Sequence, residues 1–417
     1  MSEADGSTLV RCGRLVDVAA GEILSAKAIV VRGERVDAIV HDDGSVPSGA
    51  AVVDLREHTV VPGLIDCHAH LVGALEFSGV PSIQDSEARE TLLGVSNARA
   101  ALRAGFTSVR DVGTFRAFID VELRDAIAEG IIEGPRMACA GAYVTSTSGG
   151  GEIAGLSEDV TVGPRFRVGV ADSEDEVRRA VRRILHGGAD FIKVIATGAV
   201  LTRGGIPGAP EFSEGEIRAA VEEAALYDTY VAAHAHGAEG IKRAVRAGVR
   251  SIEHGSLIDD DSIELMRDSG TYLVADIYNG DYIAEVGRRE GWPEDTLRKN
   301  DETTDAQREG FSKAVVAGVK IAYGTDSGIF PHGETARQLP YMVRYGMTPV
   351  GAVRSATVVA AELMGWSDRV GSLEPGLFAD LVAIRGHELG DLSAFAEPAL
   401  VMKSGRVVRG NADELSA

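Results

Sequence analysis

The sequence predicts an α/β protein: a (β/α)8 TIM barrel with a small, discontinuous β-sandwich domain formed by the N- and C-terminal segments. Two observations predict this fold. Strand-like and helix-like runs alternate through the middle of the chain, which is typical of βα units around a parallel sheet. Both ends of the chain instead carry short strand-like runs separated by turn residues. We therefore expect residues 1–59 and 368–417 to form the sandwich and residues 60–367 to form the barrel.

The two ends of the chain share a pattern of short strands. Residues 7–59 are rich in Val, Ile and Ala. Turn signals interrupt this stretch at Gly21-Glu22, Gly33-Glu34 and Asp43-Gly44. Near the other end, the apolar run 380–384 is followed by residues 401–408, in which Lys403–Arg406 is typical of a hairpin turn. Two β-rich ends around an α/β middle indicate that the termini meet in one domain.

The middle of the chain contains eight expected strands. Their C-terminal ends fall near His70, Asp111, Ala140, Ala196, His234, His254, Asp276 and Asp326. Helical patterns lie between them, for example at 173–185, 213–226 and 261–268, and Ser213 with Glu216 forms a capping box. In a (β/α)8 barrel the active site lies at the C-terminal ends of the strands, so functional residues are expected there.

Composition and charge narrow the class of protein. Hydrophobic residues make up 45% of the chain and charged residues 25%, which is ordinary for a globular protein, and no apolar run is long enough to span a membrane. A net charge of −21 argues against nucleic acid and anionic membranes as partners. Three cysteines do not form a disulfide framework, and the acidic residues 1–5 lack a signal-peptide pattern. We expect a cytoplasmic protein that can form a homo-oligomer.

The ends of the expected strands carry a set of metal-binding residue types. His68 and His70 are two residues apart, so in a strand they lie on one face and supply half of a metal site. This pair alone could equally be two ordinary strand-end histidines. The other candidates are Lys193, His234 with His236 after it, His254 and Asp326. Five of the ten histidines occur at or just past strand ends, which favours a common metal site.

Lys193 lies inside an apolar strand and is the unusual member of this set. Burying an ammonium group is costly unless the group is paired or neutralised. Two divalent cations nearby would lower its pKa and leave a neutral amine. A neutral amine can take up carbon dioxide to form a carbamate, whose two oxygens can bridge two metal ions. This chemistry explains why a lysine could belong to the site.

These motifs, in this order along almost the whole chain, resemble the amidohydrolase superfamily. The resemblance is strongest to the branch of imidazolonepropionase-like proteins and metal-dependent Xaa-Pro and Xaa-Arg/Lys dipeptidases. No single motif is decisive, but the ordered set is very specific. The stretches that carry it are residues 62–70, 105–111, 192–194, 234–237, 252–255, 324–327 and 371–381.

The resemblance implies a binuclear metal centre. In that interpretation, His68, His70 and Asp326 hold the more buried metal ion, His234 and His254 hold the other, and carboxylated Lys193 bridges them. Zinc is the default for such ligands, although manganese, iron and cobalt also fit. The resemblance further implies a bridging hydroxide as the nucleophile. Asp326 would then act as a catalytic residue that takes the proton of this hydroxide and delivers it to the leaving amine.

Two positions depart from the pattern of the Xaa-Pro dipeptidases. Many of these relatives have a Gly-Gly-His after the third strand, with the histidine near the substrate carbonyl, whereas this chain has Gly151 in that place. His236 stands where a tyrosine often occurs in the Xaa-Pro group. Both departures weaken a direct transfer of Xaa-Pro specificity. We expect His236 or Tyr143 to stabilise the oxyanion as catalytic residues, and Gly151 to border the substrate.

Loop residues supply candidates for substrate binding, because the loops that follow the strands set specificity in such barrels. Arg203 could pair with a substrate carboxylate. Asp276 could receive a cationic side chain, and Tyr278 could line a flat pocket. Tyr230, in the fifth strand, is a further candidate. Each of these residues could instead be an ordinary surface or core residue.

The leading hypothesis is a metal-binding hydrolase that cleaves an amide or peptide bond of a small molecule, with a dipeptide or an N-acyl amino acid as the first expectation. A second is hydrolysis of a cyclic amide, as by imidazolonepropionase, but that enzyme lacks the bridging lysine, so Lys193 counts against it. A third is hydrolysis of a xenobiotic amide, carbamate or urea. A non-catalytic scaffold on the same fold is disfavoured because all six ligands are present.

Overall fold

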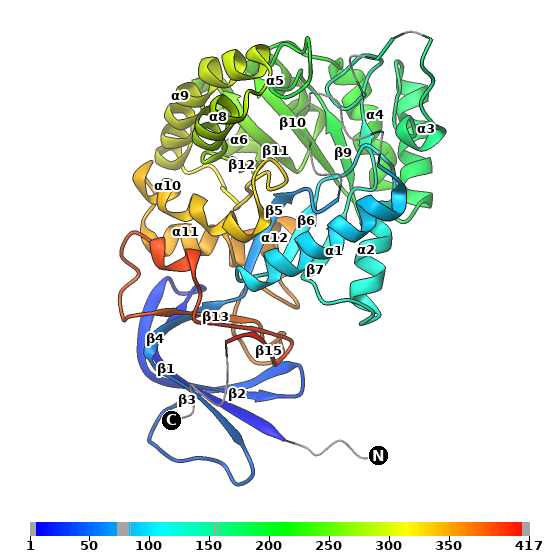
Figure 1. Cartoon of the computed structure of the whole chain (residues 1–417). Coiled ribbons are helices and arrows are strands. Elements are labelled where there is room, and N and C mark those ends of the chain that lie inside the picture. Colours follow the sequence, from blue (N-terminus) through cyan, green and yellow to red (C-terminus); the bar gives the residue numbers. More distant parts are fainter. Residues whose placement is uncertain (1–5, 73–82, 84, 154–155, 158, 411–417) are drawn as a thin grey trace. The chain divides into compact units, whose positions relative to one another are not determined.

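The computed structural model describes residues 6–72, 83, 85–153, 156–157 and 159–410 (Figure 1). The acidic residues 1–5, on which the expectation about a signal peptide rested, lie outside these ranges. The chain divides into two compact units. The first comprises Met1–Asp66, Arg99–Val109 and Gly333–Ala417, and the second comprises Cys67–Ala98 and Arg110–His332. None of the described helices is both long and apolar enough to cross a membrane.

The first unit is built on a seven-stranded sheet that combines both ends of the chain, as the sequence predicted (Figure 1). The strand order is β15-β14-β13-β4-β1-β2-β3, and β1 pairs with β4 in parallel while the other neighbours are antiparallel. Because β13 pairs directly with β4, the described strands of this unit form one continuous hydrogen-bonded sheet. The sandwich arrangement of this sheet stays a prediction. The bounds are β1 Ser7–Asp17, β2 Glu22–Arg32, β3 Arg35–His41, β4 Ala51–Pro62, β13 Leu381–Arg385, β14 Leu400–Lys403 and β15 Arg406–Arg409.

Alternating apolar residues of these strands form the core of the first unit. Val10, Ile29, Leu55 and Leu381 come from four different strands and are completely buried in one cluster. Successive side chains of a strand point to opposite faces, so this cluster needs apolar residues only at every second position. The strands at both ends of the chain were predicted from their apolar runs and turn signals, and the structure adds this alternation of buried positions.

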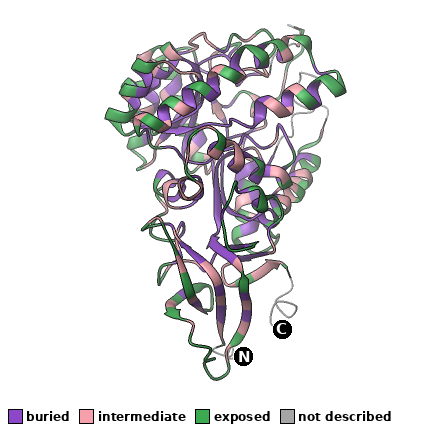
Figure 2. Ribbon diagram, turned by 90° about the vertical axis from the view of Figure 1, so that its left-hand side faces the viewer, coloured by how far each residue is buried: buried purple, intermediate pink, exposed green. Residues whose placement is uncertain are grey.

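The second unit contains a parallel sheet in the order β12-β11-β10-β9-β8. Helices follow the strands and lie beside the sheet (Figure 1), and they carry both buried and exposed residues while the strands are largely buried (Figure 2). Ser213 and Glu216 form both halves of the predicted capping box. The bounds are β8 Tyr143–Val144, β9 Ile192–Ile195, β10 Val231–Gly237, β11 Ser251–Leu257, β12 Tyr272–Val274, α3 Glu174–His186, α4 Glu214–Ala225, α5 Ala238–Ala247 and α6 Asp260–Ser269.

A three-stranded sheet, in the order β5-β6-β7, supplies the first expected strands of the barrel. Its strands are β5 Leu64–Ala69, β6 Phe106–Asp111 and β7 Arg136–Cys139. The eighth expected strand, which ends at Asp326, has only isolated bridges, from Ile321 to Leu273 and from Ser327 to Ala69. These bridges connect the segment to β12 on one side and to β5 on the other. The closed barrel and its limits at residues 60 and 367 remain predictions.

The remaining helices complete the chain. The longest is α9, whose buried residues recur every three or four positions and include several polar side chains. A buried polar face of this kind needs partners in the neighbouring structure, and those partners belong to the site. The bounds are α1 Glu87–Arg103, α2 Ile119–Ala128, α7 Asn279–Tyr282, a π-helix Ile283–Gly287, α8 Arg288–Glu290, α9 Glu294–Ala317, α10 Gln338–Arg344, α11 Pro349–Ser355, α12 Val358–Met364 and 3-10 turns Pro164–Phe166, His332–Arg337 and Ser393–Ala396.

Candidate active site

A pocket in the second unit brings all six predicted metal ligands together. The imidazoles of His68 and His70 face the carboxylate of Asp326, with Nε2 to Oδ1 distances of 3.5 Å and 3.3 Å. The other ring nitrogen of each histidine is occupied, because Nδ1 of His68 lies 2.8 Å from Oε2 of Glu253 and Nδ1 of His70 lies 2.8 Å from the carbonyl oxygen of Gly113. These hydrogen bonds fix the orientation of each ring and leave its Nε2 to bind a metal ion.

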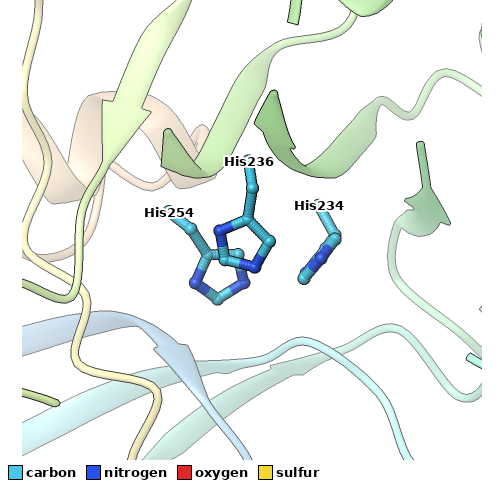
Figure 3. Close-up of side chains that lie close together, drawn as sticks. All are labelled: His234, His236 and His254. Carbon is cyan, nitrogen blue, oxygen red and sulfur yellow. The ribbon is translucent and has the colours of Figure 1, made fainter. Parts of the chain in front are cut away.

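Three further histidines form the second group, and their rings face one another (Figure 3). Ring centroids of His234, His236 and His254 are 4.5 to 4.8 Å apart. Nδ1 of His254 lies 3.1 Å from Asp276, and Nδ1 of His236 lies 2.8 Å from the hydroxyl of Ser256. His236, predicted as an oxyanion donor, is therefore close enough to be a third imidazole of this group.

The two groups meet in the pocket. The ring centroids of His68 and His254 are 4.7 Å apart, and ligand atoms of His254, Asp276 and Asp326 lie within 4.8 Å of one another. Lys193, on β9, lines the same pocket and is 1% exposed. Several parallel strands thus each contribute a side chain to this pocket, as expected at the C-terminal edge of a parallel sheet.

Burial shifts the charges of this site strongly. Burial lowers the pKa of the Lys193 amine to about 8, and the guanidinium of Arg110 acts in the same direction. Burial, followed by the nearby His254, lowers the pKa of His234 well below its usual value. For Asp326, burial alone would raise the pKa, but hydrogen bonds from His68 and His70 lower it well below its usual value. The site therefore combines a neutral imidazole at His234 with an ionised carboxylate at Asp326, which are the protonation states that bind a metal ion.

Two of the six predicted ligands have strained backbones. His254 has a φ of 69° and Asp326 a φ of 56°, in the left-handed region that residues other than glycine adopt rarely. Such conformations persist only where the surroundings enforce them, and they cluster at functional sites. The unfavourable backbone conformation therefore occurs at one predicted ligand of each group.

The donor set fits a metal centre. Nε2 of His234 is buried and has no hydrogen-bond partner among the described residues. A buried, unpaired ring nitrogen is costly unless something else binds it. Imidazole nitrogens with a carboxylate oxygen suit zinc and similar divalent ions. Metal ions would give Nε2 of His234 a partner and would also suit Nε2 of His68 and His70, which face Asp326.

Residues 59–408 match the Amidohydrolase family. The chain belongs to the amidohydrolase family. This confirms the resemblance found in the sequence. An amidohydrolase of this kind is a hydrolase that acts on C–N bonds and takes small-molecule amides as substrates.

Several individual relatives of this amidohydrolase are known. Ochratoxinase of Aspergillus niger is 34% identical over 97% of this chain and 87% of its own length. A crystal structure of a Xaa-Pro dipeptidase with methionine bound in the active site is 36% identical, with a TM-score of 0.91 over 97% of this chain and all of that one. A prolidase complexed with N-methylphosphonate-L-proline is 32% identical, with a TM-score of 0.89 over 97% of this chain and 100% of that one.

The predicted substrate residues of this amidohydrolase divide into two groups. Tyr143, Gly151, His236 and Asp276 line the pocket. Asp276 already bonds to His254, Asn279 and Gln307, an arrangement that favours holding the histidine over receiving a substrate cation. A Cβ on Gly151 would lie 2.9 Å from Cγ1 of Ile195, so neighbouring side chains fill the space of the expected histidine.

The structure does not bring the other three substrate candidates into the pocket lining. Arg203 is exposed on the loop after β9. Tyr230 precedes β10, at the opposite end from the histidines, where it stacks on Phe191 with ring centroids 5.3 Å apart. Tyr278 is buried with its ring 5.2 Å from that of Phe330. Tyr278 is thus buried, whereas its alternative interpretation was a surface loop residue. Tyr230 is half-buried against Phe191, close to the core role that was its alternative interpretation.

Sequence reasoning missed the residues that hydrogen-bond to the predicted metal ligands. Glu253 is completely buried and joins His68 to Arg110, whose guanidinium lies 2.7 Å from the Glu253 carboxylate. Gln307 on α9 donates to Asp276 at 2.8 Å. A charged residue inside an apolar strand was the available signal for Glu253, because burial of a charge requires a partner.

We expect Glu253→Gln to destabilise this amidohydrolase and to weaken its metal binding. The amide cannot accept hydrogen bonds from both His68 and Arg110, and it leaves the buried guanidinium without its counter-charge. The free energy of unfolding should fall by about 3–5 kcal/mol. Metal affinity should fall by about 10–100-fold. Urea unfolding and metal titration measure the two effects.

The matched control is Glu302→Gln, which removes a carboxylate from an exposed pair with Arg298 on α9. An exposed ion pair contributes little, so we expect no measurable change in either quantity. Wild-type stability and metal affinity in the Glu253→Gln protein would contradict the role of Glu253.

Proposed function

We propose that this amidohydrolase is a metal-dependent dipeptidase or N-acyl amino acid hydrolase with a binuclear centre of two zinc ions. The observation that carries the proposal is that two histidine groups share one pocket with Asp326 and a buried lysine. Two structural neighbours support the substrate class. One has methionine bound in its active site and the other is a complex with N-methylphosphonate-L-proline, so both proteins bind a compound that contains an amino-acid group.

Six residues would hold the metal ions. His68, His70 and Asp326 would bind one ion and His234 and His254 the other, with Lys193 bridging both after carboxylation. Burial supports the last assignment, because a buried amine that is neutral can react with carbon dioxide and then carry a negative charge that two cations stabilise. Bound metal ions would make water nucleophilic at neutral pH and polarise the scissile carbonyl.

The protein side chains would then manage the proton and the oxyanion. Asp326 would accept a proton at its carboxylate and deliver it to the nitrogen of the departing amine. His236 is better placed than Tyr143 to donate to the carbonyl oxygen. Its Nδ1 is held by Ser256, which leaves Nε2 for the pocket, whereas the hydroxyl of Tyr143 already donates to the carbonyl of Gly113 at 2.9 Å.

The test is hydrolysis of a library of dipeptides and N-acyl amino acids, followed with ninhydrin, by protein loaded with zinc in the presence of bicarbonate. We expect activity to cluster on one C-terminal residue, and the Asp326→Ala protein to be inactive on the same compounds. If protein that holds two metal ions per chain hydrolyses none of these compounds, this substrate class is overturned, and cyclic amides, carbamates or ureas are favoured. A cytoplasmic location and a homo-oligomer stay predictions.

A further inference from the structure

Helix α9 presents a buried polar face to the pocket. Asn300, Thr303 and Gln307 line the pocket from this face, and Gln307 bonds to Asp276 behind His254. Lys299 belongs to the same helix and is 1% exposed, yet it does not line the pocket. The mechanism proposed above gives this second buried lysine no role.

The partners of Lys299 lie in the loop that follows β9. Its Nζ donates to the carbonyl oxygen of Thr202 at 2.7 Å and lies 2.9 Å from Oδ2 of Asp295, one turn earlier on α9. The carboxylate of Asp295 in turn accepts the backbone N–H of Gly204. The first turns of α9 therefore bind the loop at two nearby backbone groups. A buried ammonium is kept in a protein only when such partners satisfy it.

The loop itself forms an apolar wall of the pocket. It runs from Thr197 to Pro210, which pair with each other as an isolated bridge at its base. At its tip, the carbonyl of Thr202 also accepts the N–H of Gly205, and the Thr202 hydroxyl donates to the carbonyl of Gly150 at 2.9 Å.

Side chains of this loop reach the pocket between its base and its tip. Ala199, Val200 and Leu201 line the pocket. Leu201 packs against a buried cluster that includes Trp292 and Ile329. Since the wall lies between the base and the tip, contacts that hold the tip also hold the wall.

We propose that Lys299 is a positioning residue that fixes this loop wall and thereby sets the affinity of the pocket for the apolar part of the substrate. The proposal rests on the proposed function for the nature of the substrate, but the anchoring of the loop stands on its own contacts. Lys299 acts through the wall and touches neither the ligands nor the scissile bond. It should therefore influence substrate binding more than the chemical step.

The test is Lys299→Met, which keeps the length and the apolar stem of the side chain and removes the ammonium group. Hydrogen–deuterium exchange of peptides covering residues 198–209 should accelerate about tenfold, because a charge-assisted hydrogen bond to the loop is lost. For the best substrate of the library, KM should rise about tenfold with kcat little changed. For an analogue of that substrate in which the apolar group is cut to a methyl group, KM should change less than twofold, because little apolar surface is left to contact the wall.

Two variants make this test specific. Arg298→Met removes the exposed neighbour that also pairs with Asp295, and it should leave loop exchange and KM unchanged. Lys299→Arg keeps the charge and should restore at least half of the lost protection. If Lys299→Met folds poorly, Asp295→Asn weakens the same anchor from its exposed side and should accelerate exchange in the same peptides.

Unchanged exchange and unchanged KM in Lys299→Met would overturn the proposal, and so would an equal rise of KM for both substrates. Failure of the proposed function is a separate outcome. In that case no amino-acid amide is hydrolysed by any variant, while the exchange measurement still decides whether Lys299 anchors the loop.

Discussion

Replacing Lys193 with methionine is expected to abolish metal-dependent hydrolysis while leaving the metal-free protein at least as stable as the wild type. Methionine fills a similar volume and removes a buried ammonium group. Replacement of a buried charge by a well-packed apolar side chain is often neutral or stabilising by about 1–4 kcal/mol. The same change removes the proposed bridge between the two ligand groups, so metal affinity should fall at least about 100-fold, which is the upper end of the loss seen when a residue that supports a metal ligand is removed.

Urea unfolding with chelator present and metal content after dialysis measure these two opposite effects. Lys193→Ala is the matched variant, because it leaves a cavity where the side chain was. A short carboxylic acid such as propionate can enter that cavity and supply a carboxylate, so propionate should restore activity to Lys193→Ala and not to Lys193→Met. A Lys193→Met protein that binds two metal ions with wild-type affinity would rule out the bridging role.

The candidate ligands could be predicted from the sequence because their signals are local. The two-residue period of a strand predicts that His68 and His70 share a face, although β5 itself ends at Ala69, directly before His70. His234 and His236 repeat that spacing in β10. The alternation of strands and helices then places all strand ends at one edge of a parallel sheet. Neither inference requires knowledge of any contact between distant residues.

The residues that support the ligands depend on long-range contacts and could not be predicted in the same way. Lys299 and Gln307 lie on a helix whose polar residues would ordinarily face solvent, and only packing against the site buries them. Arg203 and Tyr278 are in segments whose direction is set by tertiary contacts, so an expectation from residue type alone placed both in the substrate pocket. The strained backbone conformation of His254 likewise cannot be recognised from the sequence.

Asp326→Asn is expected to lower kcat by about 10²–10⁴-fold, the range for removal of a general acid–base. The amide keeps the shape of the side chain but cannot accept the proton, and as a neutral group it binds a metal ion more weakly. KM should change much less, because Asp326 faces His68 and His70 rather than the walls of the pocket. Steady-state kinetics and metal content per chain measure the effect.

The asparagine variant also distinguishes the effect of the Asp326 charge from the effect of its backbone conformation. With φ at 56°, residue 326 occupies a conformation in which asparagine and aspartate are enriched. Alanine lacks that tolerance, so Asp326→Ala should lose activity and also about 1–2 kcal/mol of stability, whereas Asp326→Asn should lose activity with little change in the unfolding of the metal-free protein. An Asp326→Asn protein with kcat within tenfold of the wild type would assign the proton transfer to another residue. Equal stability losses in both variants would instead show that the carboxylate, not the backbone, dominates the stability contributed by this position.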